Sequence, residues 1–264
     1  MKKLFKPFAL LGAVLVVIGT GISIAAVRFG ATWWFPNSFG YTNNSEQRLL
    51  SEDTVTVTGS IEIINIETNI CAISILPGSD FSVNYSGTDA IDISYEMTGN
   101  SIYIYEDRSN SFMFENATFT SAPIITLTVP ENYTFNGVYI YSDIGNVDIL
   151  SLNTNTLSVD SSIGNITLEN VSANEMFLSN EVGNTIINDS TVKYINYDGD
   201  IGEFELNIIG DINDYQIYAD NDIGNIYVNS TRFSTYSVYN EATKEGYILN
   251  LYSNVGDIIV NIYE

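Results

Sequence analysis

The sequence predicts an all-β fold, a single-stranded β-solenoid with rungs of about 19 residues, preceded by one N-terminal transmembrane helix. Three observations predict it. A phrase of Ile or Val followed by Gly occurs six times, and the first four of its glycines are 19 residues apart. Apolar and polar residues alternate around each copy, as they do in β-strands. An uncharged apolar stretch near the N-terminus is long enough to form the helix.

Hydrophobicity and charge predict the membrane segment. Residues 7–27 are 21 residues without a charge, and about 20 apolar residues cross a hydrocarbon core of about 30 Å. We therefore expect a transmembrane anchor or uncleaved signal over residues 7–28, after a basic cytoplasmic tail of residues 1–6. Because the basic side of a transmembrane helix stays in the cytoplasm, the acidic chain after residue 28 is expected on the outer side of the membrane. Ser23 and Ala25 leave open the alternative of a cleaved signal peptide.

The rest of the chain divides into three parts. Residues 29–53 are rich in polar and turn-forming residues and indicate a juxtamembrane tether. Residues 54–137 contain short alternating runs separated by turn signals, which predict an N-terminal β region of the solenoid. Residues 138–264 hold the glycine repeats. Between the last two glycines, residues 234–246 predict a hairpin or loop inserted into the stack.

Each glycine repeat predicts a strand, a bend and a second strand. Counted from the Ile or Val of the phrase, apolar residues recur six and four places earlier and three and five places later. In the first repeat these are Val138, Ile140, Val147 and Ile149, and together with Ile144 they predict five inward side chains per rung. Glycine marks the bend, because it permits a positive φ or the close approach of a neighbouring rung. The six glycines are Gly145, Gly164, Gly183, Gly202, Gly224 and Gly256.

Stacking turns equivalent positions into columns, and one of them is a candidate metal site. The residues before the Ile or Val are Asp143, Ser162, Glu181, Asp200, Asp222 and Asn254. Glu181, Asp200 and Asp222 belong to repeats that follow one another in the sequence, and carboxylate oxygens are the ligands that Ca²⁺ prefers. A solvated acidic stripe explains the same residues without a metal, since repulsion between exposed charges is only about 1 kcal/mol in water. No other cofactor is indicated.

Two further columns are predicted. The residues after the glycines are Asn146, Asn165, Asn184, Glu203, Asn225 and Asp257, which predict a ladder of hydrogen bonds along the stack. Outward aromatic residues are Tyr139, Tyr141, Phe177, Tyr218, Tyr227 and Tyr252. Aromatic rings stack on sugars or on protein partners, although tyrosine is also common in strands for structural reasons.

Composition excludes several functions. The formal net charge is −23, and such a field repels nucleic acid. The chain has no histidine, which removes the commonest general base and the usual catalytic triads, and no carboxylate pair stands out for glycoside cleavage. We therefore expect that the protein is not an enzyme. The single cysteine, Cys71, makes no intramolecular disulfide and is predicted to be a small buried strand residue.

At this point the sequence resembles a bacterial β-strand-repeat family known as the "putative adhesin" domain, often found behind a single membrane anchor. The matching features are Ile73-Ser74-Ile75-Leu76-Pro77-Gly78 followed by Phe81-Ser82-Val83-Asn84-Tyr85, then Ile125-Thr126-Leu127-Thr128-Val129-Pro130, then the glycine repeats, over residues 54–264. The resemblance implies a β-solenoid displayed on the cell surface, and it carries no catalytic or binding residues over to this chain.

These observations predict a non-enzymatic, extracytoplasmic interaction protein, adhesin-like and anchored in the bacterial membrane through residues 7–28. Its partner would be a protein or an envelope polymer. Two alternatives stay open. One is a sensory or scaffold module of a cell-envelope stress system, and the other is a β-helix that binds or cleaves polysaccharide.

Overall fold

The structure is a computed structural model that describes residues 48–50, 55–56, 60–87, 91–106, 123–233, 236–239 and 246–264. The predicted tail and transmembrane anchor lie outside these residues, as does the predicted tether apart from residues 48–50. Among the residues that are described, there is no helix with the length and hydrophobicity needed to span a bilayer.

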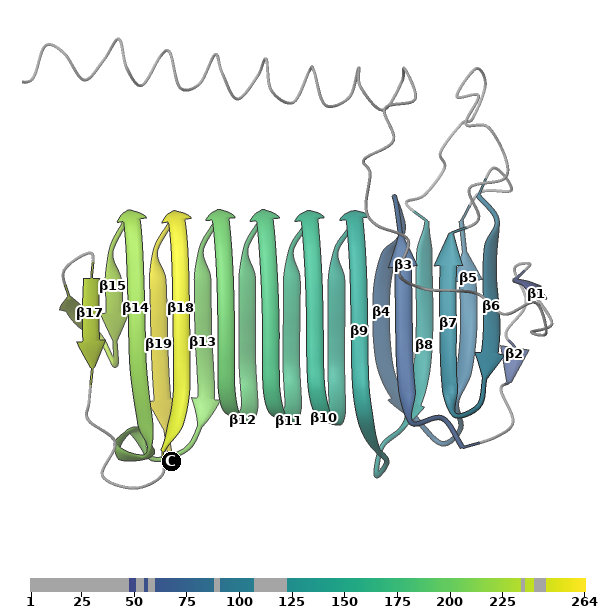
Figure 1. Cartoon of the computed structure of the whole chain (residues 1–264), viewed down its shortest axis with the longest axis horizontal. Coiled ribbons are helices and arrows are strands. Elements are labelled where there is room, and N and C mark those ends of the chain that lie inside the picture. Colours follow the sequence, from purple (N-terminus) through teal and green to yellow (C-terminus); the bar gives the residue numbers. More distant parts are fainter. Residues whose placement is uncertain are drawn as a thin grey trace, which may run out of the picture. The chain divides into compact units, whose positions relative to one another are not determined.

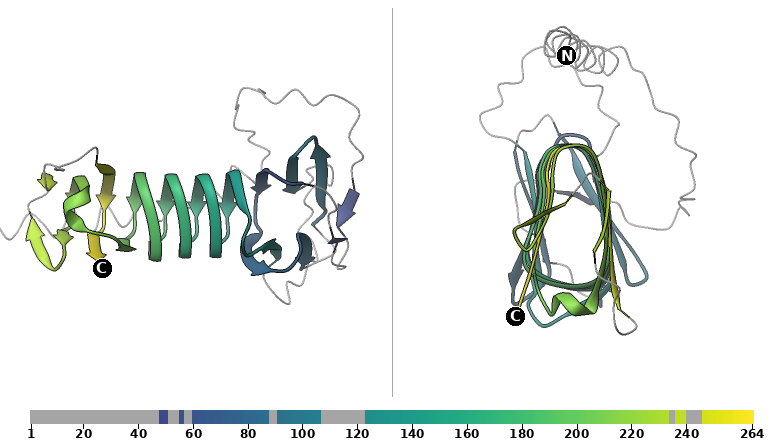
Figure 2. Two further views of the ribbon diagram at one scale, coloured as in Figure 1. Left: turned by 90° about the horizontal axis from the view of Figure 1, so that it is seen from below. Right: turned by 90° about the vertical axis from the view of Figure 1, so that its left-hand side faces the viewer.

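The described strands form one continuous sheet of 19 strands, which bends into two facing layers (Figures 1 and 2). In the first layer the spatial order is β1 (Arg48–Leu50), β6 (Ile93–Thr98), β7 (Ser101–Glu106), β3 (Ile63–Thr68), β9 (Thr134–Ile144), the second halves of β10 (Val147–Ile163), β11 (Ile166–Val182) and β12 (Thr185–Ile201), then β18 (Tyr247–Val255), β14 (Tyr215–Ile223) and β17 (Tyr236–Tyr239). In the second layer it is β2 (Val55–Thr56), β5 (Ser82–Ser86), β8 (Ile124–Pro130), β4 (Ala72–Gly78), the first halves of β10, β11 and β12, then β13 (Phe204–Ile209), β19 (Ile258–Tyr263), β15 (Ile226–Val228) and β16 (Thr231–Phe233).

The register of the long strands confirms the predicted rung length. Val147 of β10 lies opposite Ile166 of β11, and Ile166 lies opposite Thr185 of β12, a shift of 19 residues each time. The pairing is parallel, so equivalent side chains stack along the axis. The all-β solenoid predicted from the sequence is confirmed for the described part of the chain.

The order of the last two rungs differs from the prediction. β18 lies between β12 and β14, and β19 lies between β13 and β15, so the Gly256 rung separates the Gly202 rung from the Gly224 rung (Figure 1). The short 3-10 helix η1 (Ile212–Asp214) links β13 to β14, which lies one rung further along the stack. The C-terminal segment can form the rung between the Gly202 and Gly224 rungs because it has the same alternation and glycine bend as its neighbours.

Antiparallel strands close both ends of the stack. β16 runs back along β15 after a turn at Asn229 and Ser230, which have φ values of 42° and 64°, and β17 runs back along β14. A hairpin or loop inserted into the stack is predicted over residues 234–246, but the described strand of that segment, β17, lies at the end of the stack and not between rungs. At the other end β5 and β6 are antiparallel to β8 and β7, and β1, inside the predicted tether, pairs with β6. Antiparallel end strands interrupt the pattern on which another rung could stack.

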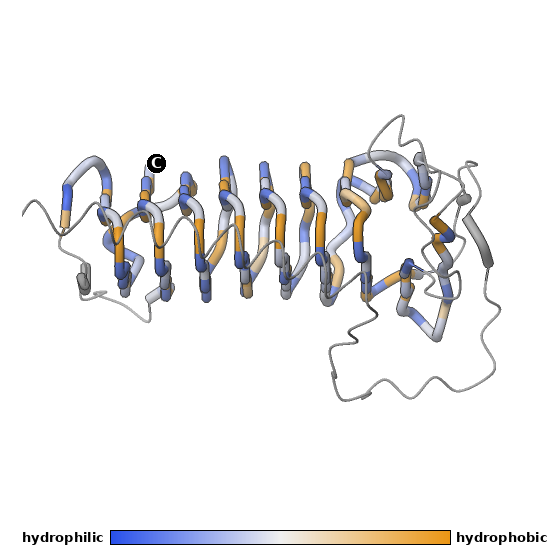
Figure 3. The backbone as a smooth tube through the Cα atoms, turned by 90° about the horizontal axis from the view of Figure 1, so that it is seen from above, coloured by the Kyte–Doolittle hydropathy of each residue, from blue (hydrophilic) through white to orange (hydrophobic). Residues whose placement is uncertain are grey.

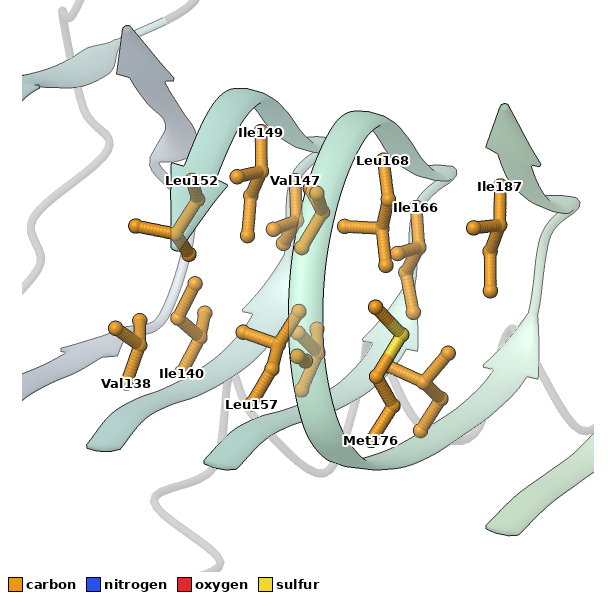
Figure 4. Close-up of a cluster of buried hydrophobic side chains, with 14 of the residues drawn as sticks. Val138, Ile140, Val147, Ile149, Leu152, Leu157, Ile166, Leu168, Met176 and Ile187 are labelled. Atoms are coloured by element: carbon orange, nitrogen blue, oxygen red, sulfur yellow. The ribbon is translucent and has the colours of Figure 1, made fainter. Parts of the chain in front are cut away.

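A single core fills the space between the two layers. Val138, Ile140, Val147 and Ile149 are at most 3% exposed, as the alternation predicts, and their equivalents recur in the following rungs (Figure 4). Hydrophobic segments return at the same place in successive rungs (Figure 3). The bend opposite the glycines adds an inward residue that the sequence analysis missed, Leu152 in the first repeat, which is 1% exposed.

The glycine bends combine both properties expected of them. All six glycines have φ between 144° and 159°, which disfavours any residue with a Cβ. Each glycine also lies against the neighbouring rung, since a Cβ on Gly164 would overlap the carbonyl oxygen of Gly145 and a Cβ on Gly256 would overlap that of Gly202. The glycine column is thus continuous through the inserted rung.

One predicted inward position points outward. The Ile or Val before each glycine, expected to be the fifth core residue of its rung, is 39% to 66% exposed in all six repeats. The last inward residue before the bend lies two places earlier and is small and polar in the first repeats, Ser142, Ser161 and Asn180, all of them buried. The reason for the difference is the bend, which begins before the glycine and turns the Ile or Val away from the core.

Candidate interaction surface

The outward Ile and Val side chains stack into an exposed apolar column along one edge of the solenoid. In spatial order its members are Ile144, Ile163, Val182, Ile201, Val255 and Ile223. Each lies opposite the next in the parallel register, so five rung spacings of about 4.8 Å separate its ends, about 24 Å in all. We call these six residues the apolar column.

A hydrogen-bonded polar ladder runs beside the apolar column, on the other side of the glycines. The side-chain Oδ1 of Asn146 accepts from the backbone N–H of Asn165 at 3.0 Å, Asn165 accepts in the same way from Asn184 at 2.9 Å, and Asn184 from Glu203 at 3.0 Å. In the inserted rung, Asp257 Oδ1 accepts from the N–H of Asn225 in the next rung at 2.8 Å. The predicted ladder is thus present in two runs, from Asn146 to Glu203 and from Asp257 to Asn225, with backbone donors in each and one side-chain donor, Asn225 Nδ2, which also donates to Asp257 at 3.0 Å. It fixes the bend that presents the apolar column.

Carboxylates crowd the side of the apolar column away from the ladder. Burial raises the pKa of Glu181, and the carboxylates of Asp200, Asp160 and Asp143 raise it further. Burial also raises the pKa of Asp160, with Asp143 adding to the rise and a hydrogen bond from Ser179 opposing it. The electrostatic potential beside the apolar column is therefore strongly negative.

The carboxylates proposed for calcium do not stand on three successive rungs. Asn254 of the inserted rung lies between Asp200 and Asp222, and its Nδ2 donates to Asp200 Oδ1 at 2.6 Å. Over the residues that the structure describes, no group of three or more acidic, histidine or cysteine side chains is arranged to hold a metal ion. The arrangement corrects the predicted column, because the chain order of the repeats is not their spatial order.

The outward aromatic residues do not form a continuous platform. Tyr139 and Phe177 are 41% and 39% exposed and share a column, but Ser158 lies between them. Tyr252 is exposed on a neighbouring column, and the hydroxyl of Tyr141 donates to Asp143 Oδ1 at 2.8 Å. The aromatic rings are thus separate surface features, whereas the aliphatic side chains are contiguous.

Cys71 occupies the bend of the rung that precedes Gly145. It is fully buried, as predicted, and lies just before β4. Burial raises the pKa of its thiol to about 12, and the carboxylate of Glu106 contributes to the rise. Glu106 accepts from the backbone N–H groups of Asn69 and Ile70 at 2.8 and 3.1 Å, so its role here is to cap the bend. Cys71 is a structural residue rather than a nucleophile.

Two shallow depressions lie at the bend opposite the glycines. One, of about 340 Å³, is lined by polar side chains such as Ser151, Asn170 and Thr191 together with the carboxylates of Glu131 and Asp189. The other, of about 510 Å³, lies at Gly78, Pro130 and Tyr133. In the first depression the polar side chains bond to one another: Asn170 Nδ2 donates to the Ser151 hydroxyl at 3.0 Å, and the Thr191 hydroxyl donates to that of Ser172 at 3.1 Å.

Comparison with known proteins places this architecture in context. The family model described as Toastrack DUF4097 matches residues 61–261. No curated protein matches the chain. The chain is similar to a solved structure described as "a putative cell adhesion protein" from Clostridium sporogenes, with a TM-score of 0.52 and 12% identity, over 83% of this chain and 100% of that one. It also matches a "putative adhesin" from Bacteroides fragilis, with a TM-score of 0.41 and 17% identity, over 83% and 98%. Identities this low show the fold alone.

Proposed function

The chain belongs to the Toastrack DUF4097 family, and from that premise we propose that it is a non-enzymatic, adhesin-like interaction protein of the bacterial cell surface. The resemblance predicted from the sequence is confirmed by this membership. The name of the solved structure with a TM-score of 0.52, "a putative cell adhesion protein", is compatible with a surface role. It supplies no partner and no binding residues for this chain.

The observation that carries the proposal is the exposure of the apolar column. Six aliphatic side chains at 39% to 66% exposure lie next to one another on an edge where hydrogen bonds link neighbouring bends. Contiguous apolar surface rimmed by polar residues marks interaction sites on soluble domains. A preformed edge also loses little conformational entropy on binding.

The chemistry of this edge favours a protein partner. Branched aliphatic side chains offer no hydrogen bonds and no aromatic face to a sugar ring, whereas they match the apolar side chains at the centre of protein interfaces. The carboxylates beside the apolar column act on the partner's charge and on the rate of encounter. We therefore place the contact on the apolar column and not in the depressions at the opposite bend.

We further propose that residues 7–28 anchor the protein in the membrane with its N-terminus in the cytoplasm. The support is the apolar stretch and the lysines before it. The test uses intact cells that produce the chain with a tag at each end. Protease added outside should remove the C-terminal tag and leave the N-terminal tag protected, whereas protection of both tags would contradict the proposed orientation.

A pair of triple variants tests the contact surface. Ile163→Thr, Val182→Thr and Ile201→Thr make the centre of the apolar column polar. Leu150→Thr, Phe177→Thr and Ile209→Thr serve as the control, because these side chains are 37%, 39% and 45% exposed but lie elsewhere. Both proteins should keep their circular dichroism spectrum and melting temperature. Partners recovered by cross-linking from intact cells should be lost with the first variant and kept with the control, and equal recovery from both would overturn the proposal.

A further inference from the structure

The C-terminal strand pair β18–β19 forms the rung between those of Gly202 and Gly224, which are consecutive in the sequence. The chain runs from β13 through η1 to β14, reverses through β16 and β17 at the end of the stack, and then returns to fill the rung that it left open. Figure 1 shows this directly, with β18 and β19 in yellow between the green strands β13 and β14.

This strand pair joins two groups of strands that have no backbone pairing with each other. The group at the end of the stack, β14 to β17, is called the end cap below. Its strands pair with one another and with β18 and β19, and none of them pairs with β12 or β13. A side-chain hydrogen bond from the hydroxyl of Tyr215 to the carbonyl of Val192, at 3.0 Å, is an additional link. Backbone hydrogen bonding between the rungs up to and including that of Gly202 and the end cap therefore runs through residues 247–263.

The place between the rungs makes specific demands on the segment that fills it. Leu249, Leu251, Ile258 and Val260 are fully buried there. Gly256 has a φ of 144° and lies against the carbonyl of Gly202, so only glycine fits the bend. These residues define a site for one strand–glycine–strand segment in parallel register.

Polar contacts on both sides add to this specificity. Asn254 donates to Asp200 at 2.6 Å, and Asn261 donates to Asn207 Oδ1 at 2.7 Å, both on the side of the earlier rungs. On the side of the end cap, the N–H of Ile262 donates to Asn229 Oδ1 at 2.9 Å. Such contacts reward one register and penalise a shifted one.

We propose that this place is a binding site for a separable strand pair, and that it accepts residues 246–264 of a second copy of the chain as well as those of its own. The contacts are the same in both cases, because the two segments are identical and only the connection between them and the end cap differs. Exchange links two chains, each holding the end cap of the other through its own C-terminal strands. Two copies can therefore form a dimer through the contacts that β18 and β19 already make within one chain.

Nicking the full-length chain tests whether the strand pair is separable. A protease recognition sequence is placed within residues 240–245, and the folded protein is cut there. The fragment of residues 246–264 should stay bound through gel filtration and should be replaced over time by an added fluorescent peptide of the same sequence. The same peptide carrying Gly256→Val is the control and should not enter. Failure of the wild-type peptide to enter, or loss of the fragment with the rest of the protein unchanged in melting temperature, would overturn the proposal.

A disulfide between neighbouring rungs reports exchange between copies. Asp200→Cys and Asn254→Cys place two thiols on adjacent parallel strands whose native side chains are in hydrogen-bond contact. After refolding at low protein concentration and oxidation, the double variant should run as a monomer on a non-reducing gel. After refolding at high concentration, disulfide-linked dimers should appear, and they should require one cysteine from each chain when two single variants are mixed. Monomers at every concentration would contradict exchange.

Discussion

Asn254 and Asp200 are 54 residues apart in sequence and lie side by side on adjacent strands, where the Nδ2 of Asn254 donates to Oδ1 of Asp200 at 2.6 Å. The contact places the last rung beside the fourth glycine repeat and moves Asp222 one rung further away. A neutral donor at position 254 separates two carboxylates that would otherwise face each other across neighbouring rungs.

Asn254→Asp should therefore destabilise the protein at neutral pH. The new carboxylate loses the hydrogen bond to Asp200 and repels it, at a cost of about 1 kcal/mol. Thermal melting at pH 7 and at pH 4 measures the effect, which should shrink at the lower pH as the carboxylates become protonated. Asn250→Asp is the control, because Asn250 donates to the hydroxyl of Tyr194. An equal loss in both variants at pH 7 would contradict the assigned neighbours.

Gly183→Ala should unfold or severely weaken the solenoid. The alanine would have to adopt a φ of 146°, and its Cβ would overlap the carbonyl of Gly164, which together should cost about 3 kcal/mol or more. Urea unfolding followed by circular dichroism measures the loss. Gly99→Ala is the matched control, since Gly99 has a φ of 59° with no atom near a Cβ, and it should cost only about 1 kcal/mol.

Stability should increase as the pH is lowered from 7 towards 4.5. The pKa of Glu181 is raised in the folded state above its ordinary value, so folding favours its protonated form, and the pKa of Asp160 is raised as well. Their contribution is present below the unfolded pKa and is lost as the pH rises through the folded pKa. Glu181→Gln should raise the melting temperature at pH 7 and show a smaller gain on acidification. Glu175→Gln should leave the pH profile unchanged, because the neighbours of Glu175 on the adjoining strands are Thr156 and Tyr194 rather than carboxylates.

The thiol of Cys71 should resist labelling in the folded protein. Its pKa is raised to about 12, so at pH 8 it is protonated as well as buried. A thiol reagent should react with the native chain only at the rate of unfolding and at once in urea. A cysteine introduced at exposed position 175 should react immediately, and equally rapid labelling of Cys71 would show that its bend opens in the native state.

The parts of the fold that depend on local pattern were predictable. Alternation placed Val138, Ile140, Val147 and Ile149 in the core, and the 19-residue spacing gave the stacking of the first four glycine repeats. The same alternation failed at Ile144, because the bend begins at this last residue of β9 and small Ser142 takes the last inward place. Hydrophobicity alone does not distinguish a core residue from an aliphatic residue on a bend.

The order of the rungs was not predictable from the repeats themselves. The backbone pattern is alike in every rung, so the glycine phrases by themselves do not show which rung lies beside which. Only the linkers differ, and the step of 22 residues from Gly202 to Gly224 was the visible signal. Its extra residues include η1, which carries the chain past the open rung. For this reason Glu181, Asp200 and Asp222 do not lie on three successive rungs, since that prediction assumed that chain order is spatial order.

The most direct measurement of the central claim is photo-cross-linking in living cells. A photoreactive amino acid is placed at position 163, 182 or 201 of the apolar column, or at control positions 150 and 209, in the full-length chain. If the apolar column is the contact surface, all three of its positions should give the same cross-linked partner, and the control positions should give none. Cross-links from positions 150 and 209 with none from the apolar column would contradict the account.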